Sequence, residues 1–404
     1  MSIQRIAAIA VIFIGTTVAW FILGTALQQR TNQQQSQLGS EVTEVWGPAL
    51  RQLHPSAYYL TAASANGRKQ IQPTLSKVTV GLNYEPKKRG LLWYRTYGAK
   101  FEAQYEITNP TPVTQTVYVK FELPGEKASF HDFSFDLGAA GTREVLPEGG
   151  AITQAISLEP GKTAPLVVAY RARGMDSWRY EFGDSARVRQ FSLVMTTDFE
   201  EINFPVGTGS PTTREHEGEG WTLEWSYPDV ISAPAIGMDM PKVLNAGPVA
   251  SRISFFAPVS LLFFFTVLLI LGMMKNANLH PVNYFFLAAG FFAFQLLFAY
   301  LVDLVPLTLS FVIASVVSLL LVCGYVAAVG GRRMLVVAVP AQVAYMVLFS
   351  YSFFFDGLTG LTITIGAIAT LALLMIATAR VNWAEKFSKP TATKPPPLPG
   401  AAVA

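Results

Sequence analysis

The residue types that could do chemistry are few in this chain, and they lie far apart. The four histidines are His54, His131, His216 and His280, and none has the His-x3-His or His-x4-His spacing that lets two imidazoles share a metal ion. Three carboxylates surround His216 in EHEGE, residues 215–219, but the neighbouring turn residues favour a solvated loop tip over a cation site. No nucleophile elbow and no phosphate-binding glycine loop occurs in the sequence. We therefore expect a protein that is not an enzyme and that binds no metal and no cofactor.

His280 lies in a short polar stretch, KNANLHPVNY, between two long apolar runs. Pro281 suits the first turn of a helix, where its missing N–H costs nothing, and Asn278 or His280 can cap that helix. These roles explain the stretch as a turn between two antiparallel helices. A docking or pH-responsive role for His280, with Pro281 and Asn283 beside it, stays open.

The composition indicates that some of the apolar residues face lipid. The chain is 51% hydrophobic and 14% charged, where soluble domains carry roughly 25% charged residues. A spanning helix needs about 20 mostly apolar residues, and six runs meet this length: 6–27, 253–274, 282–302, 306–329, 335–355 and 358–379. We expect the first run to remain as an uncleaved anchor. The lipid bilayer is then the first partner of the chain.

The charges between these runs indicate the orientation of the spans. Basic residues lie in the loops on the N-terminal side and in the tail: Lys275, Arg332, Arg333, Arg380, Lys386, Lys389 and Lys394. The short loops on the other side hold Asp303 and Asp356 and no lysine or arginine. Basic loops stay in the cytoplasm, so we expect both termini there and residues 28–252 outside. The Pro-rich tail, 381–404, should be disordered.

Between the first and second runs the apolar period changes to two. Five segments alternate in this way: KVTVGLNYE, KFEAQYEITNP, TVYVKFELPG, PLVVAYRARG and GWTLEWSYPD. Strands with one apolar face belong to antiparallel sheets that bury those faces together. We predict a stalk over residues 28–75 and an antiparallel β-sandwich over 76–252. The domain is either one enlarged sandwich or two lobes with a break near 175–185.

Some residues could bind a partner. Trp93 stands in the basic stretch KKRGLLWYR, where Lys88 and Arg89 could meet anionic headgroups or envelope polymers; a solvated hairpin is the alternative. Gln295 and Gln342 are the strongest polar groups inside the predicted spans. They favour contacts between helices over a permeation path, because ion-coupled transport needs ionisable groups near the mid-bilayer.

A charge of +3 without a basic run interleaved with aromatics excludes nucleic acid as a partner. The only cysteine, Cys323, can form no disulfide within the chain.

Four stretches in the last third resemble the CreD inner-membrane family: RISFFAPVSLLFFF, LHPVNYFFLAAGFFAFQLLFAYLVD, AAVGGRR and LMIATARVNW. The resemblance implies a Gram-negative inner-membrane protein with one N-terminal span, a β-rich periplasmic domain and a C-terminal bundle of spans. It also implies a link to cell-envelope integrity, because colicin tolerance and envelope-stress or β-lactam responses are associated with the family. It brings no catalytic residue and no cofactor.

The sequence thus predicts a membrane protein of α plus all-β class. We expect an N-terminal transmembrane anchor at 1–27, the stalk, the periplasmic sandwich and a five-helix transmembrane bundle at 253–380. The leading hypothesis is a non-enzymatic protein of envelope integrity or stress response, which contacts an envelope protein or the cell wall through its β domain. The alternatives are a component of a transport or lipid-flipping system and a sensor of a periplasmic ligand.

Overall fold

The structure is a computed structural model, and it separates into two compact units. One unit is Asn32–Asn245, and the other joins Met1–Thr31 to Ala246–Ala404. The described residues are 3–61, 67–90, 92–125, 127–138, 146–183, 185, 187–274, 279–355, 357 and 359–379. Asp356 and the tail 381–404, about which the sequence makes predictions, lie outside these ranges.

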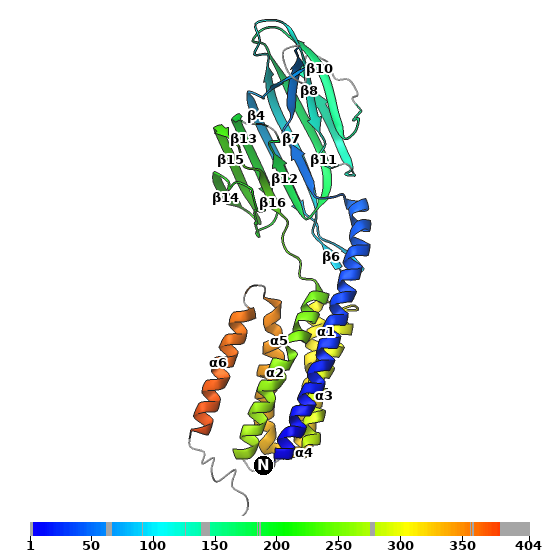
Figure 1. Cartoon of the computed structure of the whole chain (residues 1–404), viewed down its shortest axis with the longest axis vertical. Helices are drawn as coiled ribbons and strands as arrows, with labels where there is room; N and C mark the ends of the chain where they lie inside the picture. The colour runs from blue at the N-terminus through cyan, green and yellow to red at the C-terminus, as the bar shows by residue number, and fades with distance from the viewer. Residues whose placement is uncertain are drawn as a thin grey trace, which may run out of the picture. The chain divides into compact units, whose positions relative to one another are not determined.

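The long helices are those that the apolar runs predict. They are α1 (Ile3–Trp46), α2 (Ala246–Met274), α3 (Pro281–Leu301), α4 (Leu307–Gln342) and α6 (Thr359–Thr378), with a π-helix (Val343–Leu348), α5 (Phe349–Tyr351) and a 3-10 turn (Ser352–Phe354) after α4 (Figure 1). Within the described residues, six helical stretches are long and apolar enough to cross a membrane, the number predicted from the sequence. The chain is therefore a membrane protein with a separate β-rich region.

The fourth and fifth predicted spans form one helical segment that only one glycine interrupts with non-helical dihedral angles. Gly331 has φ 66° and ψ −175°, a conformation open to glycine because it has no Cβ. The two stretches that could span are Leu307–Arg332 and Met334–Phe354. In the second, Pro340 offers no N–H, and the helix changes to a π-helix three residues later, at Val343.

The first helix is longer than its apolar run. It continues through the polar residues after position 27 and ends at Trp46, where Gly47 takes a φ of 88° and so ends the helix as glycine commonly does. The stalk expected over residues 28–75 contains this helical end and the first three strands of the β domain.

The β domain contains strands of 3 to 13 residues. They are β1 (Leu50–Leu53), β2 (Ser56–Leu60), β3 (Arg68–Ile71), β4 (Leu75–Tyr84), β5 (Lys87–Arg89), β6 (Leu92–Tyr94), β7 (Thr96–Thr108), β8 (Gln115–Glu122), β9 (Phe130–Asp136), β10 (Ala151–Leu158), β11 (Thr163–Met175), β12 (Ser177–Glu181), β13 (Arg187–Thr197), β14 (Thr213–Glu217), β15 (Gly220–Ile231) and β16 (Ile236–Asp239). The five strands predicted from alternation correspond to β4, β7, β8, β11 and β15.

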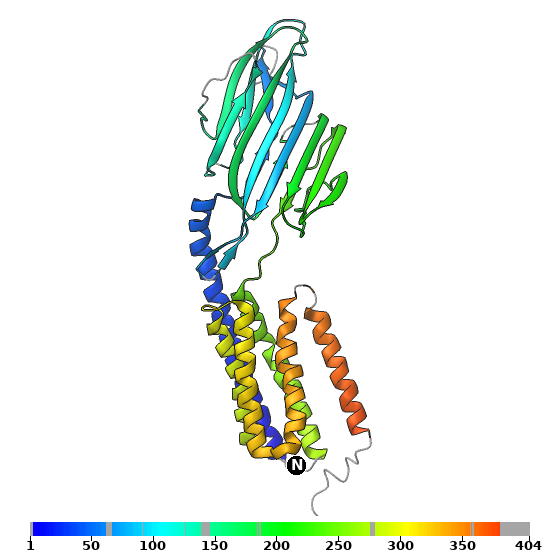
Figure 2. The same ribbon diagram turned by 180° about the vertical axis from the view of Figure 1, so that it is seen from behind.

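The strands form two larger and two smaller sheets. A seven-stranded sheet has the order β14-β15-β13-β4-β7-β11-β9, and a four-stranded sheet has the order β10-β8-β2-β3 (Figure 2). A three-stranded sheet β1-β12-β16 and the hairpin β5-β6 complete the domain. The prediction of a purely antiparallel domain is wrong in two places, because β13 runs parallel to β4 and β1 parallel to β12. Alternation shows which face of a strand is buried, but it carries no information on strand direction.

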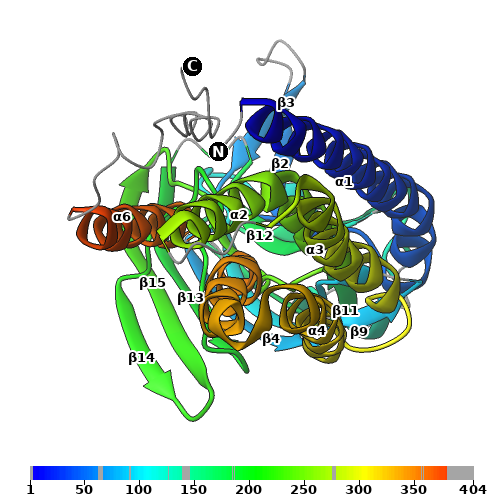
Figure 3. The ribbon, with the colours of Figure 1, turned by 90° about the horizontal axis from the view of Figure 1, so that it is seen from below.

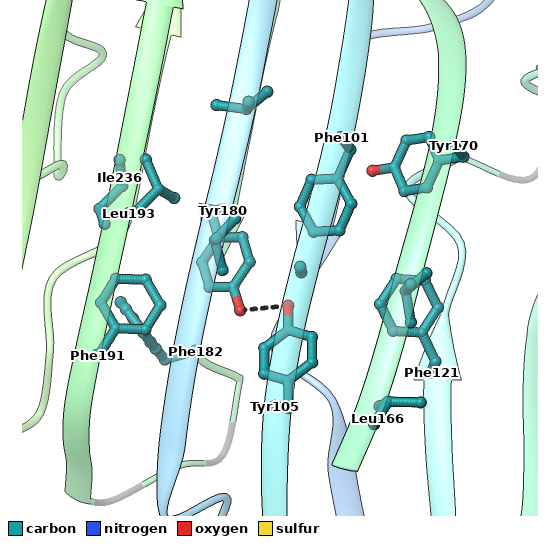
Figure 4. Close-up of a cluster of buried hydrophobic side chains, with 14 of the residues drawn as sticks. Phe101, Tyr105, Phe121, Leu166, Tyr170, Tyr180, Phe182, Phe191, Leu193 and Ile236 are labelled. Carbon is teal, nitrogen blue, oxygen red and sulfur yellow. Dashed lines mark hydrogen bonds between the residues drawn. The ribbon is translucent and has the colours of Figure 1, made fainter. Parts of the chain in front are cut away.

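One hydrophobic core contains buried residues from both larger sheets and from the three-stranded sheet. It contains the apolar faces predicted for the five strands, such as Val80, Phe101 and Val119. Figure 4 shows part of this core, where Phe101 stacks on Tyr170 with ring centroids 4.8 Å apart. The segment 175–185, where the sequence allows a break between two lobes, contributes Trp178, Tyr180 and Phe182 to the same core.

In the helical unit, α1 packs along α2 and α3. The Ser251 hydroxyl of α2 donates to the Gly24 carbonyl at 3.0 Å, and the Trp20 ring lies 6.3 Å from that of Phe292 in α3. Farther along, Arg30 forms an ion pair with Asp303. These pairs show that α1 and α3 run parallel (Figure 3), whereas α6 lies at the edge of the bundle beside α5 and α2.

Candidate binding sites

The polar stretch around His280 begins α3. His280 is the N-cap residue, and its Nδ1 accepts a hydrogen bond from the Val282 N–H at 3.3 Å; Pro281 is the first helical residue. This role confirms the capping of the helix by His280 that the sequence predicts. Asn278, the other capping candidate, and Lys275 lie outside the described residues.

The same stretch also faces a groove. Asn283 points toward α4, where its Oδ1 accepts a hydrogen bond from the Tyr325 hydroxyl at 3.0 Å. His280 and Pro281 instead line a groove of about 730 Å³ between the starts of α1 and α3, together with Arg5 and other α1 residues. We call it the helix-start groove. It brings residues of α1 next to residues of α3 that are far away in the sequence, so the sequence alone does not predict it.

The hairpin β5-β6 holds the second group of predicted site residues. Lys88 and Trp93 are cross-strand partners on its exposed face, and Trp93 is 41% exposed. Arg89 is paired with Glu41 of α1 at 3.0 Å, and Asn245 bridges the Trp93 backbone. The opposite face buries Leu92 and Tyr94 against Val42. The hairpin is therefore anchored by its apolar side and leaves Lys88 and Trp93 accessible.

The two glutamines of the spans differ in their partners. Gln342 is fully buried, and its Nε2 donates to the Ser318 carbonyl at 3.0 Å. Gln295 is also buried, but its Oε1 has no partner among the described residues, and neither have Trp20 Nε1 and Ser315 Oγ. An unpaired polar group in hydrocarbon costs several kcal/mol. Gln342 is explained by helix packing alone, whereas Gln295 is not.

The outer face of the seven-stranded sheet carries a groove that the sequence did not reveal. Its volume is about 540 Å³, and it is lined by Asn83, Glu85, Gly98, Ala99, Lys100, His131, Asp132, Arg171, Ala172 and Arg173. Gly98 leaves the floor open, since a side chain there would meet no atom within 4 Å. A second hollow of about 430 Å³ shares Lys100, Asp132 and Arg171 with it. We call the two hollows together the sheet groove.

Charged side chains cross the sheet groove in one row. Lys100 of β7 is directly opposite Arg171 of β11, and Arg171 is opposite His131 of β9. Like charges opposite one another destabilise a sheet, and here they are offset by the ion pairs Arg171–Asp132 and Lys100–Glu102. Asp132 lies at a bulge with a φ of 51°, in the left-handed region that aspartate enters more often than most residues. The groove thus presents cationic donors and a carboxylate acceptor side by side.

The tryptophans of the β domain do not form an open aromatic platform. Trp178 and Trp225 are fully buried, and Trp221 is partly buried against the core. Trp46 carries the guanidinium of Arg173 over its ring at 4.8 Å. Trp178 and Trp225 therefore belong to the core of the domain.

His54 is the buried histidine of the β domain. Its Nδ1 lies 2.7 Å from the Tyr180 hydroxyl, which in turn lies 3.0 Å from the Tyr105 hydroxyl. Burial lowers the pKa of His54 to about 3 and raises the pKa of both tyrosines. These groups stay neutral, and the two tyrosines form part of the core, where Figure 4 shows the hydrogen bond between them.

No group of three or more potential metal ligands occurs among the described residues. His216 lies in strand β14, with its ring 4.9 Å from that of Trp221. The segment 215–219 is nevertheless the solvated tip of the β14-β15 hairpin, because Gly218 and Glu219 form the turn and all five residues are exposed.

A family model described as inner membrane protein CreD matches residues 193–384. The resemblance to the CreD family is confirmed. The CreD-like region runs from β13 through all the later helices, so it includes the last strands of the β domain and every span after α1. It contains the stretch around His280 and both glutamines, whereas all the residues that line the sheet groove lie before it.

No curated protein matches the chain. A crystal structure of a Legionella pneumophila protein, described as a candidate nutrient binding protein, shares 11% identity with it. The likeness covers 66% of this chain and 99% of the other at a TM-score of 0.33. So low a score carries no argument about the function of the CreD-like chain.

Proposed function

We propose that this CreD-like chain is a non-enzymatic inner-membrane protein that supports the cell envelope through contacts of its β domain. In this proposal the two larger sheets form a β-sandwich, residues 28–252 face the periplasm, and five spans after α1 form the membrane bundle. The sheet groove is the contact site, and an envelope protein or a cell-wall polymer is the partner. The carrying observation is a preformed hollow with a fixed row of charges on an exposed sheet face.

The chemistry of the groove supports a partner rather than a reaction. Its acids and bases are paired with each other, as in Arg171–Asp132, whereas a general acid or base must be free to reach the proton that it transfers. The row of Lys100, Arg171 and Asp132 favours a partner that carries carboxylates and amines in alternation, because such groups can replace the internal ion pairs one for one.

In-cell photocrosslinking tests the proposal. A photoreactive amino acid at Gly98, whose Cβ direction is open, should capture one defined partner. The matched control places the same group at Val206, a 97% exposed residue outside the groove, and should capture none. Arg171→Glu should abolish the Gly98 product, whereas Lys77→Glu, on β4 outside the lining, should keep it. Equal products from both positions, or none under envelope stress, would contradict the proposal.

A second function, transport or lipid flipping, is favoured by one observation. Three buried polar atoms of the bundle lack partners among the described residues, on Trp20, Gln295 and Ser315. A polar substrate group passing through the bundle would satisfy them. Loss of the envelope phenotype in Gln295→Leu, with normal protein level and an intact Gly98 crosslink, would favour this function over the first.

A further inference from the structure

The helix-start groove lies where two parallel helices have not yet closed on each other. Farther along, α1 and α3 meet at Trp20 and Phe292 and again at Arg30 and Asp303. At their first turns they enclose a volume of about 730 Å³ instead. Cavities of roughly 300 to 1,000 Å³ hold ligands of drug-like size.

The lining of the groove changes from polar to apolar along the helices. Its polar end contains Gln4, Arg5 and His280. Its apolar wall contains Ala8, Val11, Ile12, Pro281, Val282 and Phe285. Arg5 and Ile12 are seven residues apart, which is roughly 10 Å along a helix. An occupant must therefore have a polar head at the end of the bundle and an apolar part directed along the helices.

The polar end carries donors that the protein does not use. Arg5 is exposed and makes no ion pair or hydrogen bond with any residue the structure describes. His280 accepts at Nδ1 from Val282, so the proton of a neutral ring is on Nε2, which has no described partner and can donate. The positive end of the α3 dipole adds to the same potential. These groups select a negatively charged head.

The side chains of the apolar wall are exposed, and contact with the bilayer explains only part of this exposure. Val11 is 69% exposed, and Val282 and Phe285 are about half exposed, at 51% and 53%. On a plain helix surface, disordered acyl chains cover such residues. Between two helices they form a channel that one chain fills, and the charge at its end fixes which lipid supplies that chain.

We propose that the helix-start groove is a binding site for one anionic phospholipid of the leaflet on the N-terminal side. Arg5 and the His280 Nε2–H bind the phosphodiester, and one acyl chain lies along Ala8, Val11, Ile12, Val282 and Phe285. The inference is independent of the sheet groove, which lies in the other unit. His280 then has two functions, since it caps α3 through one nitrogen and binds the headgroup through the other.

The test uses the full chain, delipidated in detergent, and a titration with short-chain phosphatidylglycerol, short-chain phosphatidylcholine or inorganic phosphate. We expect phosphatidylglycerol to bind at least tenfold more tightly than phosphatidylcholine, and phosphate alone not to bind. Arg5→Gln should reduce the preference for phosphatidylglycerol by about fivefold, the effect of one basic residue near an anionic surface. His280→Ser keeps a capping oxygen and should also reduce it.

Matched variants separate the site from general electrostatics. Arg332→Gln removes an exposed cation that does not line the groove, and it should leave the preference unchanged. Ala8→Phe fills the apolar wall and should weaken both lipids, whereas Ala7→Phe, on an exposed position outside the lining, should weaken neither. Thermal unfolding of the helical unit at the wild-type temperature shows that each variant is folded.

Three results would overturn the proposal. Equal affinity for the two lipids would show that the groove is only hydrophobic. Binding of inorganic phosphate alone would show that the groove is a site for free anions. A photoreactive group at Val11 that captures the C-terminal tail of the chain instead of lipid would identify a protein segment as the occupant.

Discussion

The β domain buries its large apolar side chains, whereas the helical unit leaves many side chains of the same types exposed. In the β domain the large side chains of the core, such as Phe191 and Trp225, are at most 1% exposed. In the helical unit many stay exposed, as in Leu371 at 60% and Ile376 at 76% on α6. Water drives the first arrangement, and lipid tolerates the second because hydrocarbon is as apolar as leucine. Exposure of a leucine is therefore informative only together with the solvent around it.

The largest expected effect compares one leucine from each unit. Leu193→Ala in β13 removes a fully buried side chain and should lower the free energy of unfolding of the β domain by about 2 to 5 kcal/mol. Leu371→Ala in α6 should change the stability of the helical unit by less than about 1 kcal/mol. Urea and detergent denaturation of the full chain measure the two. Equal losses would mean that α6 is covered by protein.

The next effect is specific to the β domain and depends on pH. The pKa of His54 is lowered from 6.5 to about 3 by burial, so the folded state favours the neutral ring. Its stabilising contribution is complete above pH 6.5 and is lost as the pH falls toward 3, with a slope of up to about 1.4 kcal/mol per pH unit. His54→Phe should flatten urea-denaturation midpoints over this range, and His216→Gln should not. A slope that survives His54→Phe would assign it to other groups.

A smaller effect distinguishes the two glutamines of the bundle. Gln342→Leu removes the hydrogen bond to Ser318 and should destabilise the bundle by about 0.6 to 1.7 kcal/mol. Gln295→Leu removes an acceptor without a described partner and should be neutral or stabilising. Thermal unfolding in detergent compares them. Destabilisation by Gln295→Leu would reveal a bound polar group and support the transport function.

The smallest effect concerns the ion pair between Arg30 and Asp303, whose side chains are 36% and 22% exposed. A partly solvated pair contributes about 0.2 to 1 kcal/mol, so Asp303→Asn should lower the stability of the helical unit by no more than this. A double-mutant cycle with Arg30→Gln isolates the coupling energy. A coupling above about 2 kcal/mol would mean that the pair is shielded from water.

Sequence alternation predicted the long strands because each buries one complete face, as in β7 from Phe101 to Ile107. It missed β13, where Gln190 takes a φ of 42° and interrupts the period. Parallel pairing was not predictable either, since it depends on segments more than 100 residues apart, such as β4 and β13.

The candidate sites were predictable only where they are local. Capping by His280 follows from the Pro next to it, but the helix-start groove needs Arg5, which is distant in sequence. The sheet groove needs the register of β7, β9 and β11, and the outward residues Lys100 and Arg171 alone do not reveal it. The partners of His54 likewise come from β7 and β12.

The break at Gly331 has a consequence for biogenesis. Gly331, near the end of the stretch Leu307–Arg332, is the one residue with non-helical dihedral angles before Met334–Phe354 begins. With so short a connection, we expect the two stretches to enter the membrane together as one hairpin. A residue that favours helix at position 331 would merge them into one rod too long for the bilayer, with the later spans inverted.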